Sequence, residues 1–235
     1  SGTLLLKGTS EQKAWFDTLQ AMGNESITLQ NECIVSYYDS SYDSVEIWRG
    51  PYQNLATTRS LKAGSISVKK TFRIDGRVPL TIEAAYHEYK GDILISCDAL
   101  FKSNNQEGLK ALGKIDAGTF DITFECNKVS VAGEITAKNL ELKQTSGENS
   151  FDARGNITLI ANCTSFVNQF FTWEKIKAID ITINRGEWKS EGEVESDNIS
   201  IPDGSTKWTS LNNVSVDGNI LANVATKWEA LSGVI

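Results

Sequence analysis

Apolar and polar residues alternate along much of the chain, which is the pattern of β-strands that bury one face. Between residues 64 and 100 the alternation is interrupted at Asp75-Gly76 and again near Lys90-Gly91. An Asp-Gly pair between two alternating runs is a strong short-range hairpin signal. The pattern therefore predicts an antiparallel meander over residues 64–100.

Two segments favour helix. Ser10 is a suitable N-cap, and Gly23 supplies a stop after a stretch from Lys13 to Met22 whose one β-branched residue is Thr18. This predicts a helix over Ser10–Met22, and a second short helix is expected over Asn105–Gly113. From residue 119 onward short alternating runs are separated by glycines, which suits a sandwich or a β-solenoid.

A spaced apolar motif recurs along the chain. It consists of a large apolar residue, Leu or a similar residue three positions on, and an apolar residue three positions further. Its copies are Phe16-Leu19-Met22, Leu109-Leu112-Ile115, Trp173-Ile176-Ile179, Trp208-Leu211-Val214 and Trp228-Leu231-Val234. The spacing of three predicts a single helical turn that feeds a strand. The last two copies begin at Trp208 and Trp228, twenty residues apart, which is typical of a solenoid coil.

A longer repeat indicates an internal duplication. The intervals Phe16–Cys33 and Leu109–Cys126 are both 17 residues long, which gives a shift of 93 residues. The same shift places Ile66 and Val68 on Leu159 and Ala161. We interpret this as a helical turn followed by sheet, repeated twice.

The predicted fold is mainly β with short helical turns. Residues 1–103 are expected to form a helix and an antiparallel β meander, and residues 104–235 a β-solenoid-like repeat region, either as two domains or as one continuous domain. An α+β fold with two repeated helix-plus-sheet units is the alternative. A chain of 235 residues is long enough for either arrangement to bury a core.

The charge pattern bears on the partners. The net charge is −7, and no basic run is longer than Lys69-Lys70. This argues against nucleic acid and anionic membranes, which both require a concentrated basic surface. No apolar stretch approaches the ~20 residues that span a bilayer, so we expect no membrane insertion of this fragment. The chain opens with Ser1-Gly2 instead of Met, which leaves an upstream signal or anchor open.

The four cysteines each end an alternating apolar run and are expected to point into the core. They are Cys33, Cys97, Cys126 and Cys163. Three alternatives stand, in this order: inert buried thiols, one or two disulfides, and a zinc site. The closest spacing, 29 residues between Cys97 and Cys126, does not resemble the close pairs that usually hold zinc.

Five Asn-x-Ser/Thr sequons occur, at Asn24, Asn156, Asn162, Asn198 and Asn213. A chain rich in these residue types yields several by chance, so they favour a secreted protein only weakly.

The segment from Ser36 to Gln53 combines aromatic rings with Ser, Asp and Arg side chains. Flat amphipathic rings beside short hydrogen-bonding groups suit sugar faces and protein hot spots. The predicted ligand-binding residues are Tyr37, Tyr38, Tyr42, Trp48, Arg49 and Tyr52. The alternative is that alternate rings pack into the core of a local hairpin.

Two further aromatic groups are weighed against structural roles. Tyr86-His87-Glu88-Tyr89 falls at a predicted turn and is interpreted as an exposed hairpin end. Trp173, Trp208 and Trp228 occupy equivalent positions in the spaced motif and could grip an extended polysaccharide. Repeated large apolar residues are more often stacked in a core, and we favour that interpretation.

The acidic stretch Glu187–Asp197 places Glu191, Glu193, Glu195 and Asp197 on one strand face. We favour a solvated face that discourages edge-to-edge pairing over a calcium site, whose ligands usually converge from a loop. Phosphate-binding loops and Ser-His-Asp arrangements are absent, and His87 is the single histidine. The sequence therefore predicts a protein that is not an enzyme, with no cofactor, no metal and no catalytic residue.

Two phrases resemble known coils. They are Val-Ser-Val-Ala-Gly-Glu-Ile-Thr-Ala-Lys-Asn-Leu-Glu-Leu from Val129 and Gly-Asn-Ile-Thr-Leu-Ile-Ala-Asn from Gly155. Similar Val/Ile/Gly phrases occur in bacterial β-helix surface proteins, including haemagglutinin-type adhesins and bactofilins. The resemblance covers residues 119–235 and implies a parallel β-helix there. The predicted antiparallel meander departs from it, and no functional residue is transferred.

The leading functional hypothesis is a non-catalytic extracellular or cell-surface protein that adheres to a polysaccharide or another surface through the aromatic segment. The first alternative is a structural subunit of a pilus-like or bactofilin-like assembly, which self-associates. A polysaccharide-degrading enzyme ranks last, because no convergent acid and base residues are apparent.

Overall fold

The computed structural model describes the strands of the first part of the chain and most residues after position 79. The described residues are 3–8, 19–21, 25–29, 33–36, 41–42, 44–49, 59–68, 71–75, 79–103, 105–145, 147–223 and 227–230. Side chains are described at 66, 68, 71–74, 79–103, 105–145, 147–223 and 229. This part of the chain is mainly β and contains no helix.

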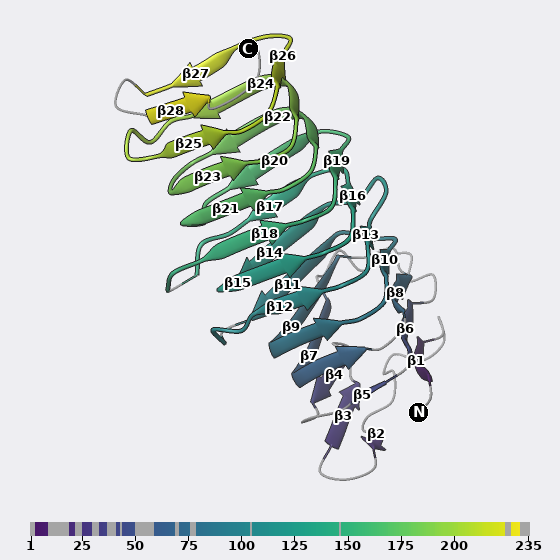
Figure 1. Cartoon of the computed structure of the whole chain (residues 1–235). Helices are drawn as coiled ribbons and strands as arrows, with labels where there is room; N and C mark the ends of the chain where they lie inside the picture. Colours follow the sequence, from purple (N-terminus) through teal and green to yellow (C-terminus); the bar gives the residue numbers. More distant parts are fainter. Residues whose placement is uncertain are drawn as a thin grey trace.

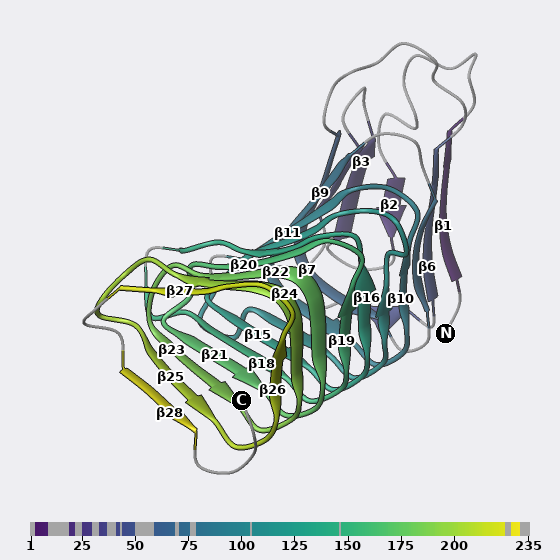
Figure 2. The same cartoon turned by 90° about the horizontal axis from the view of Figure 1, so that it is seen from above.

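The strands wind into a parallel β-solenoid with three faces (Figure 1). Seen from above, the coils lie behind one another with a roughly triangular outline (Figure 2). Each coil passes through the first, second and third face in turn, and each strand pairs in parallel with strands of the coils before and after it.

The first face contains strands that begin each coil. They are β1 (Thr3–Gly8), β6 (Ser44–Arg49), β8 (Phe72–Asp75), β10 (Ile93–Ile95), β13 (Ile115–Asp116), β16 (Ile135–Ala137), β19 (Ile157–Leu159), β26 (Val214–Val216) and the first halves of β22 (Ile176–Ile183) and β24 (Val194–Ile201).

The second face follows. Its strands are β11 (Ala99–Ser103), β14 (Ile122–Cys126), β17 (Leu140–Leu142), β20 (Asn162–Ser165), β27 (Ile220–Ala222), the first halves of β7 (Arg59–Val68) and β9 (Leu80–Tyr89), and the second halves of β22 and β24.

The third face closes each coil. Its strands are β5 (Ser41–Tyr42), β12 (Leu109–Ala111), β15 (Lys128–Val131), β18 (Ser150–Ala153), β21 (Gln169–Thr172), β23 (Glu187–Ser190), β25 (Lys207–Ser210), β28 (Lys227–Ala230) and the second halves of β7 and β9. A separate antiparallel sheet contains β2 (Leu19–Ala21), β3 (Glu25–Leu29) and β4 (Cys33–Ser36).

Like residues stack on like residues inside the solenoid. On the first face Ile93 pairs with Ile115, which pairs with Ile135, and all three side chains are buried. From β8 onward, successive partners on this face lie 18 to 22 residues apart, as in Ile176↔Val194 and Ile93↔Ile115. The coils are therefore of the length predicted from the Trp208 and Trp228 spacing, and Trp208 pairs with Trp228.

A file of aromatic rings runs through the core along the solenoid axis. Neighbouring ring centroids lie 4.5 to 6.2 Å apart in the series Tyr89, Phe101, Phe124, Phe151, Phe170, Trp188 and Trp208. The closest pair, Trp188 and Trp208, is stacked with nearly parallel rings, at an angle of 4° between the ring planes. Their indole N–H groups donate to the inward hydroxyls of Thr172 and Ser190. The buried Trp side chains thus keep hydrogen-bond partners inside the core.

Glycines line the corner where the third face turns into the first. A Cβ at Gly133 would lie 2.5 Å from the backbone carbonyl group of Gly113, and a Cβ at Gly155 would lie equally close to that of Gly133. The coils approach each other to a strand spacing of ~4.8 Å, which leaves no room for a side chain that points along the axis. The corner therefore requires glycine at these positions.

A ladder of Asp and Asn side chains supports the corner before the second face. The Asn139 amide donates to Asp121 at 2.8 Å, and Asn139 Oδ1 accepts from the Asn162 backbone N–H at 2.9 Å. Further along, the Asn198 amide donates to Asp180 at 2.8 Å. The bond from the Asn162 N–H satisfies a backbone group at the bend, and the amide–carboxylate bonds join the side chains of successive coils there.

The same geometry explains why sequons recur. Asn156, Asn162, Asn198 and Asn213 each stand at a corner, and each is followed by a buried residue and then by an outward Thr or Ser. An Asn at a corner, followed by an inward residue and a polar outward residue, produces the sequence Asn-x-Ser/Thr. The fold therefore accounts for these sequons without selection for glycosylation. Asn24 lies outside the described residues.

Several predictions about the first half of the chain are wrong. Strands β8, β9 and β10 do not form an antiparallel meander, because Ile93 of β10 pairs in parallel with Phe72 of β8, and β9 pairs in parallel with β7. The break at Lys90-Gly91 is a corner between two faces of a coil. A corner and a hairpin both interrupt alternation, so the sequence pattern does not separate them.

The predicted helical turns are also corners. Leu109 lies in β12, Leu112 is exposed at the corner, and Ile115 lies in β13, so the expected helix over Asn105–Gly113 is absent. The described part of the other predicted helix, residues 19–21, is strand. Most of Ser10–Met22 lies outside the described residues.

The predicted duplication is not present in the solenoid. Ile66 and Val68 lie on the third face, whereas Leu159 ends a strand of the first face. The repeating unit is one coil. The parallel sheet continues through the predicted boundary near residue 103, since β11 pairs with β14, while the division into two domains stays a prediction. Across the described residues, no helix has the length and apolar character needed to cross a membrane.

Gly133→Ala is expected to destabilise the protein by about 1–3 kcal/mol, because the new methyl group would overlap the backbone of Gly113. Chemical denaturation of the two proteins measures the loss. The control is Gly147→Ala, whose Cβ would meet only Asn127 Oδ1 at 3.8 Å and should not lower stability. Equal losses in both variants would contradict the close-packed corner.

His87 was expected at an exposed hairpin end, but it lies in β9 and is fully buried. Its Nε2 donates to the Lys102 carbonyl at 2.8 Å, and its Nδ1 lies 3.1 Å from the Tyr89 hydroxyl, which fits a neutral ring that accepts from Tyr89. Burial lowers the pKa of His87 to about 4, although the bond to the Lys102 carbonyl acts in the opposite direction.

The His87 shift predicts a loss of stability in acid. The unfolded chain binds a proton near pH 6.5 and the folded chain only near pH 4, so stability is complete above pH 6.5 and falls as the pH drops toward 4. The loss amounts to roughly 3 kcal/mol. Urea midpoints of the wild type and His87→Gln across pH 4–7 isolate this component, because Gln does not titrate. Parallel curves for the two proteins would show that His87 is not responsible.

Candidate functional site

The residues predicted to bind ligand lie largely outside the described part of the chain. Tyr37, Tyr38 and Tyr52 are outside it altogether. Tyr42 lies in β5, and Trp48 and Arg49 lie in β6, but their side chains are among those not described. The ligand-binding role of this segment stays a prediction.

Three described cysteines, Cys97, Cys126 and Cys163, are buried thiols outside any disulfide. Burial raises the pKa of both Cys126 and Cys163 to about 12, so these thiols carry no nucleophilic thiolate near neutral pH. The interpretation as inert core residues is confirmed for Cys126 and Cys163, and Cys97 is likewise buried. The side chain of Cys33 lies outside the described residues.

The acidic stretch forms ion pairs with lysines of neighbouring strands. Glu195 contacts Lys175 and Lys177, and these lysines lower the pKa of Glu195 to about 2. Glu193 pairs with Lys175, and Glu191 pairs with Lys189 at 2.6 Å. No group of three or more His, Cys, Asp or Glu side chains among the described residues is arranged to hold a metal ion. These carboxylates are solvated, as predicted, but they do not share one strand face, because Glu191 follows β23 and Glu195 lies in β24.

The three tryptophans of the spaced motif do not share one environment. Trp208 is buried and stacks on Trp188, and Trp228 is its register partner in the next coil. Trp173 is 44% exposed and lies one residue beyond the end of β21. The core interpretation is confirmed for Trp208 and is wrong for Trp173, whose place in the core file is taken by Phe170.

Trp173 belongs to a column of outward positions at the end of the third face. The backbone N–H of each column residue donates to the coil before, as in Arg154 to Val131, Trp173 to Ala153 and Glu191 to Thr172. Leu112 stands in the same column, closer to the N-terminus, and is 45% exposed. The column therefore displays its side chains to solvent, and Trp173 is its one aromatic member among the described coils.

Polar groups from both neighbouring coils fix the Trp173 ring. Its indole N–H donates to Asp152 Oδ1 at 2.6 Å. The Arg154 guanidinium lies 5.7 Å and the Lys189 ammonium 5.9 Å from the ring centroid, within cation–π range. Both cations are also held by carboxylates, since Arg154 pairs with Asp152 at 3.5 Å and Lys189 pairs with Glu191.

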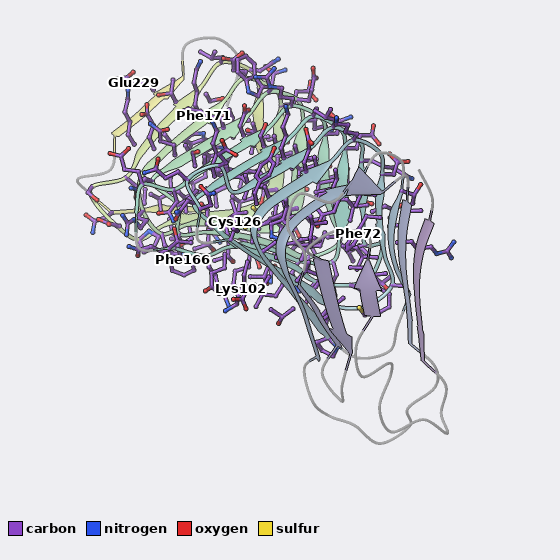
Figure 3. All side chains as sticks on the ribbon, turned by 90° about the horizontal axis from the view of Figure 1, so that it is seen from below. Phe72, Lys102, Cys126, Phe166, Phe171 and Glu229 are labelled. Carbon is purple, nitrogen blue, oxygen red and sulfur yellow. The ribbon has the colours of Figure 1, made fainter. Side chains whose placement is uncertain are left out.

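A hollow of about 160 Å³ lies beside the ring. It is lined by Phe171, Thr172, Trp173, Lys189 and Glu191. Phe171 is half-buried and points outward from β21, and Figure 3 shows it on the same side of the solenoid as Glu229, with Lys102 and Phe166 on another side. Two rings, two cations and two carboxylates thus share one exposed patch, which we call the Trp173 patch: Asp152, Arg154, Phe171, Trp173, Lys189 and Glu191.

The Trp173 patch can hold a ligand that offers a flat apolar face and several hydroxyl groups. The indole and phenyl rings supply stacking area, and the carboxylates and cations supply acceptors and donors at the rim. No protein-family model, curated protein or solved structure matches the chain. The evidence for its function therefore comes from its own residues.

Sequence reasoning missed Phe171, Asp152, Arg154 and Lys189. The signal available was the run Phe170-Phe171-Thr172-Trp173, in which strict alternation sends Phe170 and Thr172 inward and Phe171 and Trp173 outward. The neighbours from the other coils could be found only with the register of β18, β21 and β23.

Proposed function

We propose that the protein is a non-catalytic adhesion protein of the cell surface or extracellular space, which binds polysaccharide through the third face of its solenoid. The observation that carries the proposal is an exposed Trp173 ring held in a fixed orientation by Asp152. The tyrosines and Trp48 between residues 37 and 52 are proposed to contribute to binding, on the sequence pattern alone.

The exposure of Trp173 is difficult to explain by packing. Phe170 and Thr172 are nearly fully buried and supply the inward side chains of this strand, so the core does not require the ring of Trp173. A large ring that remains 44% exposed leaves apolar surface in water, which a bound sugar face would cover. The hydrogen bond to Asp152 limits the rotation of the ring, so less entropy is lost on binding.

A binding role is favoured over catalysis by the state of the reactive groups. His87, Cys126 and Cys163 are buried in the core and are not open to a substrate. Asp152 and Glu191 of the Trp173 patch are both paired with cations.

Trp173→Ala is expected to weaken binding to an immobilised neutral polysaccharide about tenfold or more, because stacking of one ring contributes on the order of 1–3 kcal/mol. Retention on glucan, xylan and mannan supports measures it, with heparin and polygalacturonate as charged comparators. Leu112→Ala is the matched control, since Leu112 occupies the same column with equal exposure. Unchanged retention of Trp173→Ala, or reducing ends released from the polymer, would defeat the proposal.

A structural subunit that associates with itself is the second candidate function. Ile160 and Ile179 are 55% and 45% exposed on neighbouring coils, at the corner between the first and second faces. An apolar pair at a corner could contact a second solenoid laterally.

For this second function, light scattering over a concentration series should show association of the wild type and none of Ile160→Ser with Ile179→Ser. Both substitutions are at exposed positions, so folding should be retained. A wild type that stays monomeric at high concentration would remove this candidate.

A further inference from the structure

A polar groove of about 800 Å³ opens at the other end of the third face. Its lining includes Gln106, Asn127, Lys128, Ser150, Gln169 and Glu187. The volume falls within the range of sites that hold small ligands, and amides, a hydroxyl, one ammonium group and two carboxylates supply both donors and acceptors. An array of this kind matches the hydroxyl groups of a sugar better than an apolar ligand.

The groove and the Trp173 patch lie on the same strand. Gln169 lines the groove, Phe171 and Trp173 line the hollow, and all three point outward from β21 or its end. Residues two apart on a strand are separated by ~6.6 Å, so Gln169 and Trp173 are about 13 Å apart along the chain. An amide and two rings therefore form a track along one coil, in the direction of the strand.

Neighbouring strands flank this track with polar side chains. In-register pairing places Ser150 and Glu187 on either side of Gln169, and Asp152 and Lys189 on either side of Phe171. A ligand that lies along β21 would meet hydrogen-bonding groups on both sides over the whole length of the track.

The charges around the track balance each other. Arg154 pairs with Asp152, Lys189 with Glu191, and Lys207 with Glu187 at 3.5 Å. Lys128 and Glu148 add one further positive and one further negative charge to the lining of the groove. A ligand carrying sulfates or carboxylates would have to displace these carboxylates from their cations. The track thus favours an uncharged ligand.

We infer that the groove and the Trp173 patch are two subsites for one linear, uncharged polysaccharide, which lies along one coil, parallel to β21. The inference rests on the proposed function and adds to it the charge, the direction and a minimum length of the ligand. A short fragment occupies the Trp173 patch alone, whereas a longer fragment also reaches Gln169 and Ser150.

Calorimetry with disaccharide and hexasaccharide fragments of the retained neutral polymer tests the inference. Gln169→Ala combined with Ser150→Ala should weaken hexasaccharide binding about tenfold, because two hydrogen bonds between uncharged groups are lost. Binding of the disaccharide should not change. Lys110→Ala combined with Ser130→Ala is the matched control, because these residues are outward on the same face in earlier coils.

The outcomes separate the two proposals. If the double variant binds hexasaccharide as the wild type does while Trp173→Ala loses both fragments, the groove is not a subsite and the adhesion function stands. If heparin or polygalacturonate binds more tightly than the neutral polymers, the assignment of an uncharged ligand is overturned. If no polymer or fragment binds, both the track and the adhesion function fail.

Discussion

In-register parallel pairing of successive coils is the constraint on which the structure depends. Because each strand pairs with its equivalent one coil away, every inward residue lies on an equivalent inward residue, and the core becomes a set of stacked columns. Isoleucines fill one column and aromatic rings another, in which the ring centroids of Trp188 and Trp208 lie 4.5 Å apart. The corners must then also stack, which is why glycine recurs where the third face meets the first and why Asp and Asn side chains bond from coil to coil before the second face.

The same constraint creates the outer surface. Parallel register aligns outward residues into columns and rows, so three consecutive coils bring Asp152, Phe171 and Lys189 together although they are far apart in sequence. Solvated pairs such as Lys102–Glu125 and Lys143–Glu141 recur on this surface. The Trp173 patch differs from these ion pairs because it exposes aromatic rings that are not packed in the core. The rigid sheet fixes the spacing between those rings and the groove. A flat, inflexible surface of this kind suits an extended ligand better than a compact one.

Buried polar groups show how little freedom the interior leaves. Burial keeps His87 neutral while its ring bonds to the Lys102 carbonyl and the Tyr89 hydroxyl, and the three described cysteines serve as small apolar residues. Groups that would suggest chemistry in another fold are here parts of columns. The resemblance of residues 119–235 to β-helix proteins is accordingly a resemblance of fold, which extends at least from Phe72 to Ala222, and it carries no identity as an adhesin or a bactofilin.

The sequence by itself determined the strands, their inward faces and the length of a coil, because alternation and like-on-like stacking depend on local spacing. It correctly placed the inner residues Ile122, Phe124 and Trp208. The tertiary structure alone decided strand direction, which turned a predicted meander into parallel coils, and it placed Trp173 outside while its motif equivalent Trp208 is inside. The physical reason lies at the corners. A bend of the chain changes which residues of the alternating pattern face inward, and that change depends on how the coil packs on its neighbour. The spacing of residues within one segment does not contain this information.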